Sequence, residues 1–179
     1  VCNAAAALTA ALTMGWDMGI CCAALADFGA VFGRMEQLTV GETSVRIVLV
    51  KNPAGCDRAL EFLASQSEDV LPIFCLNDNA ADGTDVSWIW DINFSVFQQV
   101  TRVITSGTRA YDIAVRIKCS GYSQDQIVVL PDLDAAIQEL NAHPGKKFII
   151  SNYTATQPTR NALIHWISKN GGNVNEYNH

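Results

Sequence analysis

The sequence is poor in basic residues, and this scarcity excludes two kinds of binding surface. Its 179 residues include 12 Lys and Arg against 18 Asp and Glu, which gives a formal net charge of -6 at pH 7. The longest basic run is Lys146-Lys147. So few cations exclude a surface that must neutralise many phosphates, and we expect no nucleic-acid partner. A polybasic patch for binding anionic membranes is absent for the same reason.

Motifs for metal binding by cysteine are also absent. Six cysteines stand at positions 2, 21, 22, 56, 75 and 119, and no two have the C-x-x-C spacing that brings two thiolates to one zinc ion. Scattered cysteines within apolar runs are typical of a reducing compartment, where thiols stay free. We therefore expect buried unpaired cysteines, no metal site in this chain and a cytoplasmic location.

Several catalytic and targeting signals are missing as well. The chain has no G-x-x-x-x-G-K-[ST] phosphate loop and no G-x-S-x-G nucleophile elbow, and its three histidines do not neighbour a plausible nucleophile. The Ala-rich first 14 residues lack the basic start of a signal peptide, and polar residues interrupt their apolar run. These absences predict that the chain has no transmembrane segment, is not a self-contained hydrolase and has no ATP-binding motif of its own.

Strand-like and helical runs alternate along most of the chain. Helices are predicted at residues 3–14, 18–28, 57–64, 94–100, 109–118, 133–140 and 159–169, and strands at 38–40, 45–50, 70–76, 101–105, 126–130 and 147–151. Residues 77–87 show no periodicity and are predicted to form a loop. Alternation with short connections predicts an α/β, Rossmann-like, mostly parallel sheet with helices on both faces, preceded by a short helical segment. The boundary between the two is placed at Gly33-Arg34.

The segment 77–91, NDNAADGTDVSWIWD, is the most informative stretch because it directly follows a strand predicted to be buried. Its acids and aromatic residues are Asp78, Asp82, Asp85, Asp91, Trp88 and Trp90. Ligands bind at the carboxyl ends of parallel strands, and clustered carboxylates there can orient a histidine, coordinate Mg²⁺ or Ca²⁺, or bind a substrate amine. The alternative is that Asp78 and Asp82 cap turns while the tryptophans anchor a core or an interface.

Two further strand ends carry candidate binding residues. Lys51 follows a strong strand and can reach a carboxylate or a phosphate; alternatively, this is a simple turn in which Asn52 caps the next helix and Pro53 begins it. Arg109 stands in the first turn of a predicted helix, where anions are stabilised. The alternative for Arg109 is a structural pair with Asp112 on its own helix.

A set of short motifs appears in a characteristic order. They are FGRME (32–36), LVKNPAG (49–55), LNDN (76–79), ADG (81–83), DVSWIWD (85–91), SGTRA (106–110) with Asp112, and YTA (153–155). Together they resemble the C-terminal domain of the MurT-type subunits of lipid II isoglutaminyl synthases, which are relatives of the Mur ligases. The resemblance implies a Mur ligase C-terminal fold for residues 34–170, the last helices of a truncated Mur-ligase central domain for residues 1–33, and a polar tail for residues 171–179.

The resemblance also implies a reaction. An ATP-dependent ligase subunit, working at the inner face of the cell membrane, would activate the D-Glu α-carboxylate of the stem peptide of lipid II, or of its peptidoglycan precursor, as an acyl phosphate. Ammonia from a GatD-type glutamine amidotransferase subunit would then convert it to D-isoglutamine. ATP and Mg²⁺ would bind mainly upstream of this chain, as would the zinc of the central domain, so the chain alone is expected to be inactive.

The resemblance assigns roles to the candidate residues. An Asp of this subunit is expected to orient the catalytic His of the partner; Asp78 is the first choice, followed by Asp82, Asp85 and Asp91. Lys51, Asn52 and Arg109 are expected to bind or position substrate, and Trp88 and Trp90 to lie at the partner interface. Two alternatives stay open: a non-catalytic Rossmann-like module that docks a partner through segment 77–91, and a small-molecule binding domain.

Overall fold

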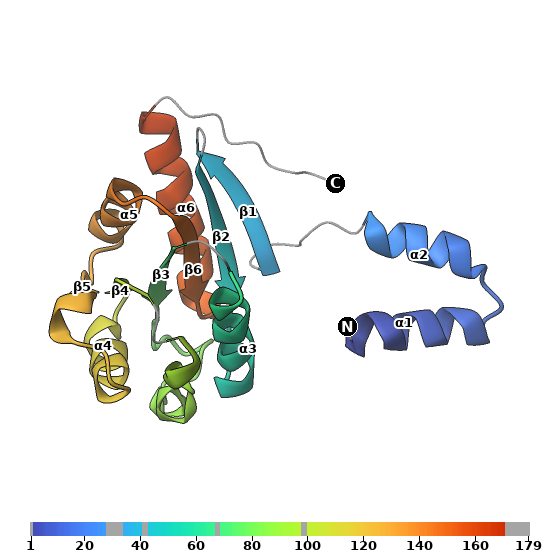
Figure 1. The fold of residues 1–179 in the computed structure, drawn as a ribbon, viewed down its shortest axis with the longest axis horizontal. Coiled ribbons are helices and arrows are strands. Elements are labelled where there is room, and N and C mark those ends of the chain that lie inside the picture. The colour runs from blue at the N-terminus through green and yellow to red at the C-terminus, as the bar shows by residue number, and fades with distance from the viewer. Residues whose placement is uncertain (1, 28–33, 41–42, 67–68, 98–99, 171–179) are drawn as a thin grey trace. The chain divides into compact units, whose positions relative to one another are not determined.

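The computed structural model describes residues 2–27, 34–40, 43–66, 69–97 and 100–170. The chain divides into two compact units. One contains helices α1 (Cys2–Thr13) and α2 (Met18–Ala26), and the other contains all the strands and the remaining helices (Figure 1). The last residue of the helix predicted at 18–28, Gly33 at the predicted boundary, residues 98–99 of the helix predicted at 94–100 and the tail predicted at 171–179 lie outside the described residues.

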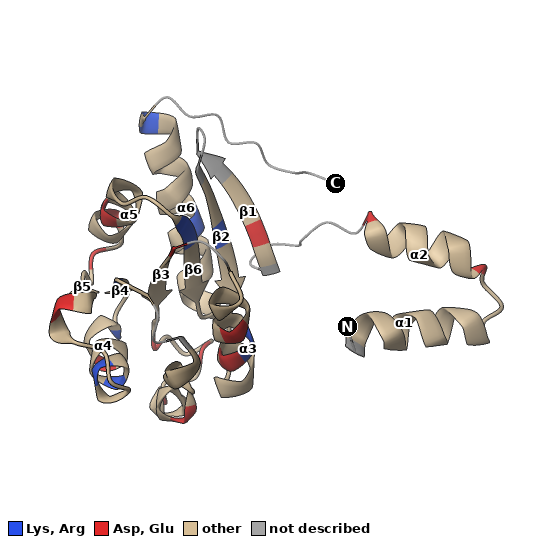
Figure 2. Ribbon diagram, viewed as in Figure 1, with Lys and Arg blue, Asp and Glu red and all other residues tan. Residues whose placement is uncertain are grey.

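The first unit is a pair of helices without charged side chains in their helical turns (Figure 2). Asp17 begins α2 by accepting a hydrogen bond from the backbone N–H of Ile20 at 3.0 Å, as an N-cap residue does. Ala11 is the one buried side chain among those described in this unit. Its exposed large apolar side chains are Leu12, Met14, Trp16, Met18, Ile20 and Leu25. By themselves, α1 and α2 therefore enclose almost no core.

The second unit is built on a six-stranded sheet. The strands lie in the order β1 (Arg34–Val40), β2 (Thr43–Leu49), β6 (Lys146–Ser151), β3 (Val70–Cys75), β4 (Val103–Ser106), β5 (Ile127–Val129). β1 and β2 form an antiparallel pair, and all other neighbours are parallel. All six residues of β3 are buried, as expected for a strand that is covered on both faces of a parallel sheet.

Helices cover both faces of this sheet. On one face, α3 (Pro53–Ala64), α4 (Ala110–Cys119) and the short 3₁₀ helices η1 (Ser87–Asp91) and η2 (Phe94–Phe97) enclose one apolar cluster, in which the Phe74 and Phe94 rings pack edge to face at 5.4 Å. On the other face, α5 (Leu133–Ala142) and α6 (Tyr153–Lys169) cover a second cluster. A third 3₁₀ helix, η3 (Gln124–Gln126), precedes β5. The predicted α/β architecture is confirmed.

The structure corrects four local predictions. The α-helix predicted at 94–100 is wrong for its described residues, because Phe94–Phe97 form the short 3₁₀ helix η2 and Val100 is not helical. The predicted loop 77–87 overlaps the start of a second 3₁₀ helix, η1. Helix α6 begins at Tyr153, six residues before the predicted start, and includes Pro158.

The fourth correction concerns the cysteines. Cys56 and Cys75 are buried as predicted, and burial raises the pKa of the Cys56 thiol to about 12. Cys22 and Cys119 are exposed, and Cys21 is half-buried, so the prediction that the cysteines are buried fails for these three. No described helix is both long enough and apolar enough to span a membrane.

Candidate functional site

The carboxyl ends of four strands meet at one edge of the sheet, and every predicted site residue follows one of them. β2 leads to Lys51, β3 to segment 77–91, β4 to Thr108 and Arg109, and β6 to Asn152. In an open parallel sheet this is the edge at which ligands bind. The topology therefore gathers the candidate residues, which are far apart in sequence, at one end of the second unit.

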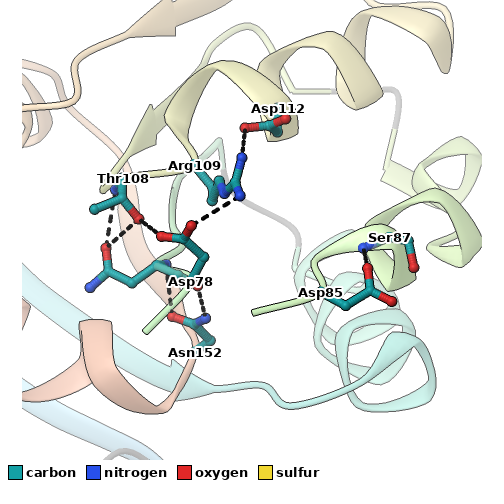
Figure 3. Close-up of polar contacts among 8 residues, drawn as sticks. Asp78, Asp85, Ser87, Thr108, Arg109, Asp112 and Asn152 are labelled. Atoms are coloured by element: carbon teal, nitrogen blue, oxygen red, sulfur yellow. Dashed lines mark hydrogen bonds and ion pairs between the residues drawn. The ribbon is translucent and has the colours of Figure 1, made fainter. Parts of the chain in front are cut away.

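Asn77 and Asn152 join the ends of β3 and β6. The Asn152 side-chain amide donates to the carbonyl of Asn77 at 2.7 Å, and its Oδ1 accepts from the Asn77 N–H at 3.1 Å (Figure 3). The Asn77 side chain continues the network, because its Oδ1 accepts from the backbone N–H of Thr108 at 3.1 Å. These bonds fix the backbone from which Asp78 projects. Asn152 is buried, and the sequence analysis assigned it no role.

Asp78 contacts two consecutive residues of the turn between β4 and α4. The Thr108 hydroxyl donates to Asp78 Oδ1 at 2.8 Å, and Arg109 Nη2 lies 2.9 Å from Oδ2 (Figure 3). The Thr108 hydrogen bond is the largest cause that lowers the pKa of Asp78, and the positive charge of Arg109 adds to it. The Asp78 side chain is 32% exposed. The site therefore presents an ionised, oriented carboxylate to solvent.

Arg109 lies between two carboxylates. Besides Asp78, its Nη1 lies 3.4 Å from Asp112 Oδ2, three residues along α4. The pairing with Asp112 that the sequence suggested as the structural alternative is thus present. The anion beside the start of α4 is the Asp78 carboxylate, supplied by the chain itself.

The other three acids of segment 77–91 have different surroundings. Asp82 accepts from the backbone N–H of Thr154 at 2.9 Å and from the Thr154 hydroxyl, so it caps the start of α6 from outside the helix. Asp85 accepts from the backbone N–H of Ser87 at 2.8 Å, which lowers its pKa and begins η1. Asp91 is exposed at the end of η1. Asp82 thus caps a helix that is distant in sequence, whereas the alternative from the sequence was a cap on a local turn.

Lys51 and Asn52 lie at the end of β2. Asn52 Oδ1 accepts from the backbone N–H of Gly55 at 2.8 Å and Pro53 is the first residue of α3, so the predicted strand-to-helix turn is confirmed. Lys51 lines a cleft of about 190 Å³. The other lining residues are Leu49, Val50, Ala81, Asp82, Trp88, Asn152 and Tyr153. This cleft lies between the ends of β2 and β6 and segment 77–91.

The two tryptophans differ in exposure. Trp88 is half-buried, packs against the apolar cluster under α3 and α4, and lines the cleft beside Lys51. Trp90 is 53% exposed and shares a shallow hollow with Tyr111, Asp112 and Val115 of α4. Arg116, which the sequence analysis missed, donates to the carbonyl of Ile89 at 3.1 Å and to that of Ile92, and so ties η1 to α4. Trp90 is therefore a surface residue on a fixed support.

The structure brings some predicted residues together and keeps others apart. Asp78 and Arg109 are in contact, and Lys51, Asp82 and Trp88 share one cleft. Among the described residues, no three His, Cys, Asp or Glu side chains are grouped so as to hold a metal ion. The network is completed by Thr108, Thr154 and Asn152, for which the sequence predicts no role. Their position directly after β4 and β6 is the signal that points to them.

The chain is similar to a group of ligase subunits. The family model described as MurT ligase C-terminal matches residues 49–156. The chain is 31% identical over 164 residues to the MurT subunit of the glutamine-hydrolyzing lipid II isoglutaminyl synthase of Streptococcus pneumoniae. The aligned region covers 90% of this chain and 37% of that protein. It is 34% identical over 128 residues to the Staphylococcus aureus subunit of the same name, covering 70% of this chain and 29% of that protein.

Solved structures share the fold at low sequence identity. The UDP-N-acetylmuramate-alanine ligase MurC of Thermotoga maritima matches with a TM-score of 0.71 at 13% identity, over 94% of this chain and 37% of that one. Folylpolyglutamate synthase of the same organism matches with a TM-score of 0.61 at 16% identity, over 90% of this chain and 38% of that one. The chain thus spans between 29% and 38% of the length of these four proteins. Because the family model covers more than half of this chain, the chain belongs to the MurT ligase C-terminal family.

Proposed function

We propose that this chain is the C-terminal domain of the ligase subunit of a glutamine-hydrolysing lipid II isoglutaminyl synthase. The names of the relatives and the family of the chain support this function. Residues 1–33 then belong to the end of a central domain, residues 34–170 form the C-terminal domain, and residues 171–179 are its tail. The single observation that carries a catalytic role is the half-buried Asp78 carboxylate, which is held on both oxygens at the binding edge of the sheet.

The proposed reaction has two halves. In the ligase subunit, the D-Glu α-carboxylate of the lipid II stem peptide takes the γ-phosphoryl group of ATP, giving an acyl phosphate and ADP. Ammonia attacks the acyl carbon, inorganic phosphate leaves, and a proton is lost to give the D-isoglutamine amide. In the GatD-type partner subunit, glutamine and water give glutamate and the ammonia that is used. ATP and Mg²⁺, and the zinc of the central domain, bind outside this chain, and the complex acts at the cytoplasmic face of the membrane.

Asp78 is proposed to serve the partner's half of the reaction. An ionised carboxylate that accepts the N–H of a histidine fixes the imidazole tautomer and stabilises the imidazolium that forms during catalysis. A carboxylate offers about four acceptor positions, of which Thr108 and Arg109 occupy two in Asp78. Lone pairs therefore remain for an incoming imidazole.

The other acids fit this role less well. Both oxygens of Asp82 bind Thr154, and Asp85 is engaged by the backbone of its own turn. Asp91 is exposed at the end of η1. Asp78 therefore stays the first choice, with Asp82, Asp85 and Asp91 as the alternatives.

The remaining candidates serve substrate and partner. Lys51 provides a cation in the cleft at the end of β2, where it can face a carboxylate or phosphate of the substrate, while Asn52 holds the turn that carries it. Trp90, in its hollow beside α4, and Trp88, at the wall of the cleft, are the proposed partner contacts. Buried aromatic side chains anchor many interfaces of this kind.

The test is the glutaminase activity of the assembled complex. The full-length subunit that contains this domain is mixed with its glutaminase, and glutamate release is followed for wild type, Asp78→Asn and the control Asp134→Asn, an exposed acid in the first turn of α5. Loss of the orienting Asp of a serine-protease triad costs a factor on the order of 10⁴ in kcat, so we expect a fall of roughly 10² to 10⁴ for Asp78→Asn with binding retained. Unchanged glutamate release in this variant would refute the role of Asp78.

A docking module without catalysis is the second candidate function. The exposed hollow of Trp90, Tyr111 and Val115 favours it, because large apolar side chains on a rigid helix face suit a protein partner. In that case Trp90→Ala abolishes the complex, whereas Asp78→Asn leaves both the complex and glutamate release intact.

A further inference from the structure

Both carboxylate oxygens of Asp78 are held by neighbouring residues of a single turn. The Thr108 hydroxyl donates a hydrogen bond to Asp78 Oδ1 at 2.8 Å, and Arg109 Nη2 lies 2.9 Å from Asp78 Oδ2. One donor alone would leave the carboxylate free to rotate about its terminal bond. Two donors on opposite oxygens restrict that rotation and set the direction in which the remaining lone pairs point.

The turn that carries these donors is itself fixed against β3. The Arg109 N–H donates to the carbonyl of Leu76 at 3.0 Å, and the Thr108 N–H donates to Asn77 Oδ1 at 3.1 Å. Gly107 has φ +86°, and a Cβ at this position would lie 2.4 Å from the Leu76 carbonyl oxygen. This close approach of the backbone requires glycine. The distance between Asp78 and its two donors is therefore set by the ends of β3 and β4.

Arg109 is poorly placed to receive another anion. Its two terminal nitrogens already face Asp78 and Asp112, at 2.9 and 3.4 Å. An incoming substrate carboxylate would meet two negative charges close to the single positive one, which opposes its binding. The guanidinium is instead arranged as a bridge between an acid of segment 77–91 and the first turn of α4.

We propose that Thr108 and Arg109 are positioning residues, which hold the Asp78 carboxylate in the orientation that accepts the partner's histidine. The proposal rests on the proposed function, in which Asp78 serves the glutaminase. It assigns Arg109 to the glutaminase half of the reaction and not to the ligase substrate. Thr108 acts through its hydroxyl, and Arg109 acts through its charge and its planar fork of N–H groups.

A pH profile separates positioning from a general structural role. Thr108 and Arg109 both lower the pKa of Asp78, so removing either donor raises it. The carboxylate is then protonated at a higher pH and loses its capacity to accept the histidine N–H. The acidic limb of the glutaminase profile is expected to move to higher pH, whereas a structural defect elsewhere would lower activity at every pH without moving the limb.

The first experiment compares Thr108→Val with Thr108→Ser in the full-length subunit assembled with its glutaminase. The Val side chain has a similar shape but no donor, so we expect kcat for glutamate release to fall roughly three- to tenfold, as for the loss of one hydrogen bond, with KM for glutamine unchanged. The Ser variant should restore both kcat and the acidic limb. An unaltered pH profile for Thr108→Val would overturn the proposal.

The second experiment uses Arg109→Gln with Arg58→Gln as a matched control. Arg58 also pairs with an acid three residues along its helix, Glu61 at 2.6 Å, but contacts no strand end. Amidation is measured with glutamine and, separately, with ammonium chloride, which bypasses the glutaminase. We expect Arg109→Gln to lower only the glutamine-dependent rate. A raised KM for the stem-peptide substrate in the ammonium reaction would instead make Arg109 a substrate-binding residue and overturn its positioning role.

Asp78→Asn in the same assays separates this proposal from the proposed function. If Asp78→Asn abolishes glutamate release and Thr108→Val leaves the pH profile unchanged, the positioning roles fail while the catalytic Asp stands. If Asp78→Asn remains active, the proposed function of Asp78 fails, and the positioning proposal fails with it.

Discussion

The two edges of the sheet each carry an arginine bound to acidic groups, but the surroundings of these groups differ. At the end of the sheet where β4 begins, the amino-terminal edge, Glu139 Oε1 lies 2.7 Å from Arg102 Nη2 and 3.0 Å from His143 Nε2. These contacts join three side chains. At the carboxyl-terminal edge, the Asp78 carboxylate contacts the side chains of Thr108 and Arg109. The backbone N–H groups of these two residues are in turn hydrogen-bonded to Asn77 and Leu76, which follow β3.

This difference shows what makes a charged cluster suitable for chemistry. A cluster of side chains alone can rearrange when one member changes, since each chain keeps its rotational freedom. A carboxylate whose donors are fixed by backbone hydrogen bonds keeps one geometry, as a catalytic or binding group must. We therefore expect substitutions at the carboxyl-terminal edge to cost much more stability and activity than substitutions at the other edge.

The largest effect is expected for Gly107→Ala. An added Cβ would lie 2.4 Å from the Leu76 carbonyl oxygen and 2.9 Å from Asn77 Oδ1, at a backbone with positive φ. Strain and displacement of the strand end together should reduce the free energy of unfolding by about 3 kcal/mol or more. Urea denaturation followed by circular dichroism measures this loss. The control is Gly83→Ala, where φ is also positive but no atom lies within 4 Å; equal losses in the two variants would show that the close approach to β3 is unimportant.

A second, smaller effect is expected for Asn152→Ala. Truncation leaves the N–H and the carbonyl of Asn77 without their side-chain partner at a largely buried position. We expect a loss of about 2 to 3 kcal/mol in the free energy of unfolding, with a weakened glutaminase activity because Asp78 moves with Asn77. The Asn161→Ala variant, at an exposed position of α6, is the control. If Asn152→Ala lowered the free energy of unfolding by less than Asn161→Ala does, water would have replaced both hydrogen bonds between Asn152 and Asn77.

The third prediction concerns the cap supplied by Asp82. Asp82→Ala removes the acceptor for the Thr154 N–H at the first turn of α6, so a loss of about 1 to 2 kcal/mol is expected. Because the cap acts on Thr154 in the first turn, hydrogen exchange should accelerate at the start of α6 and remain slow at its centre. Uniform acceleration along α6 would contradict a capping role.

The smallest effect is expected at the amino-terminal edge. Glu139→Gln removes the charge shared by Arg102 and His143, whose side chains are about a third exposed. Such pairs contribute little in water, so we expect a change of about 0.5 kcal/mol that disappears in 1 M salt, with glutaminase activity unchanged. A salt-independent loss comparable to that of Asn152→Ala would remove the distinction between the two edges.

Much of the fold could be predicted from local patterns. The fully apolar run of β3, the turn at Asn52-Pro53 and the amphipathic face of α4 each depend on residues close in sequence, and the structure contains all three. The early start of α6 was missed, because its first turn depends on Asp82, 72 positions before Thr154. The helix predicted at 94–100 was also wrong: its described residues Phe94–Phe97 form a 3₁₀ helix, and the local apolar pattern does not distinguish the two helix types.

The sequence by itself determined which residue types stand at the strand ends, since alternating strands and helices place those residues at one edge of a parallel sheet. It also determined the family, through motifs that are local and keep their order. Only the tertiary structure decided which acid is held by which donor. Asp82 faces the start of α6, whereas Asp78 faces Thr108 and Arg109, and these contacts join residues 30 to 72 positions apart. No local pattern encodes contacts of that kind, because they depend on how neighbouring strands align in the folded sheet.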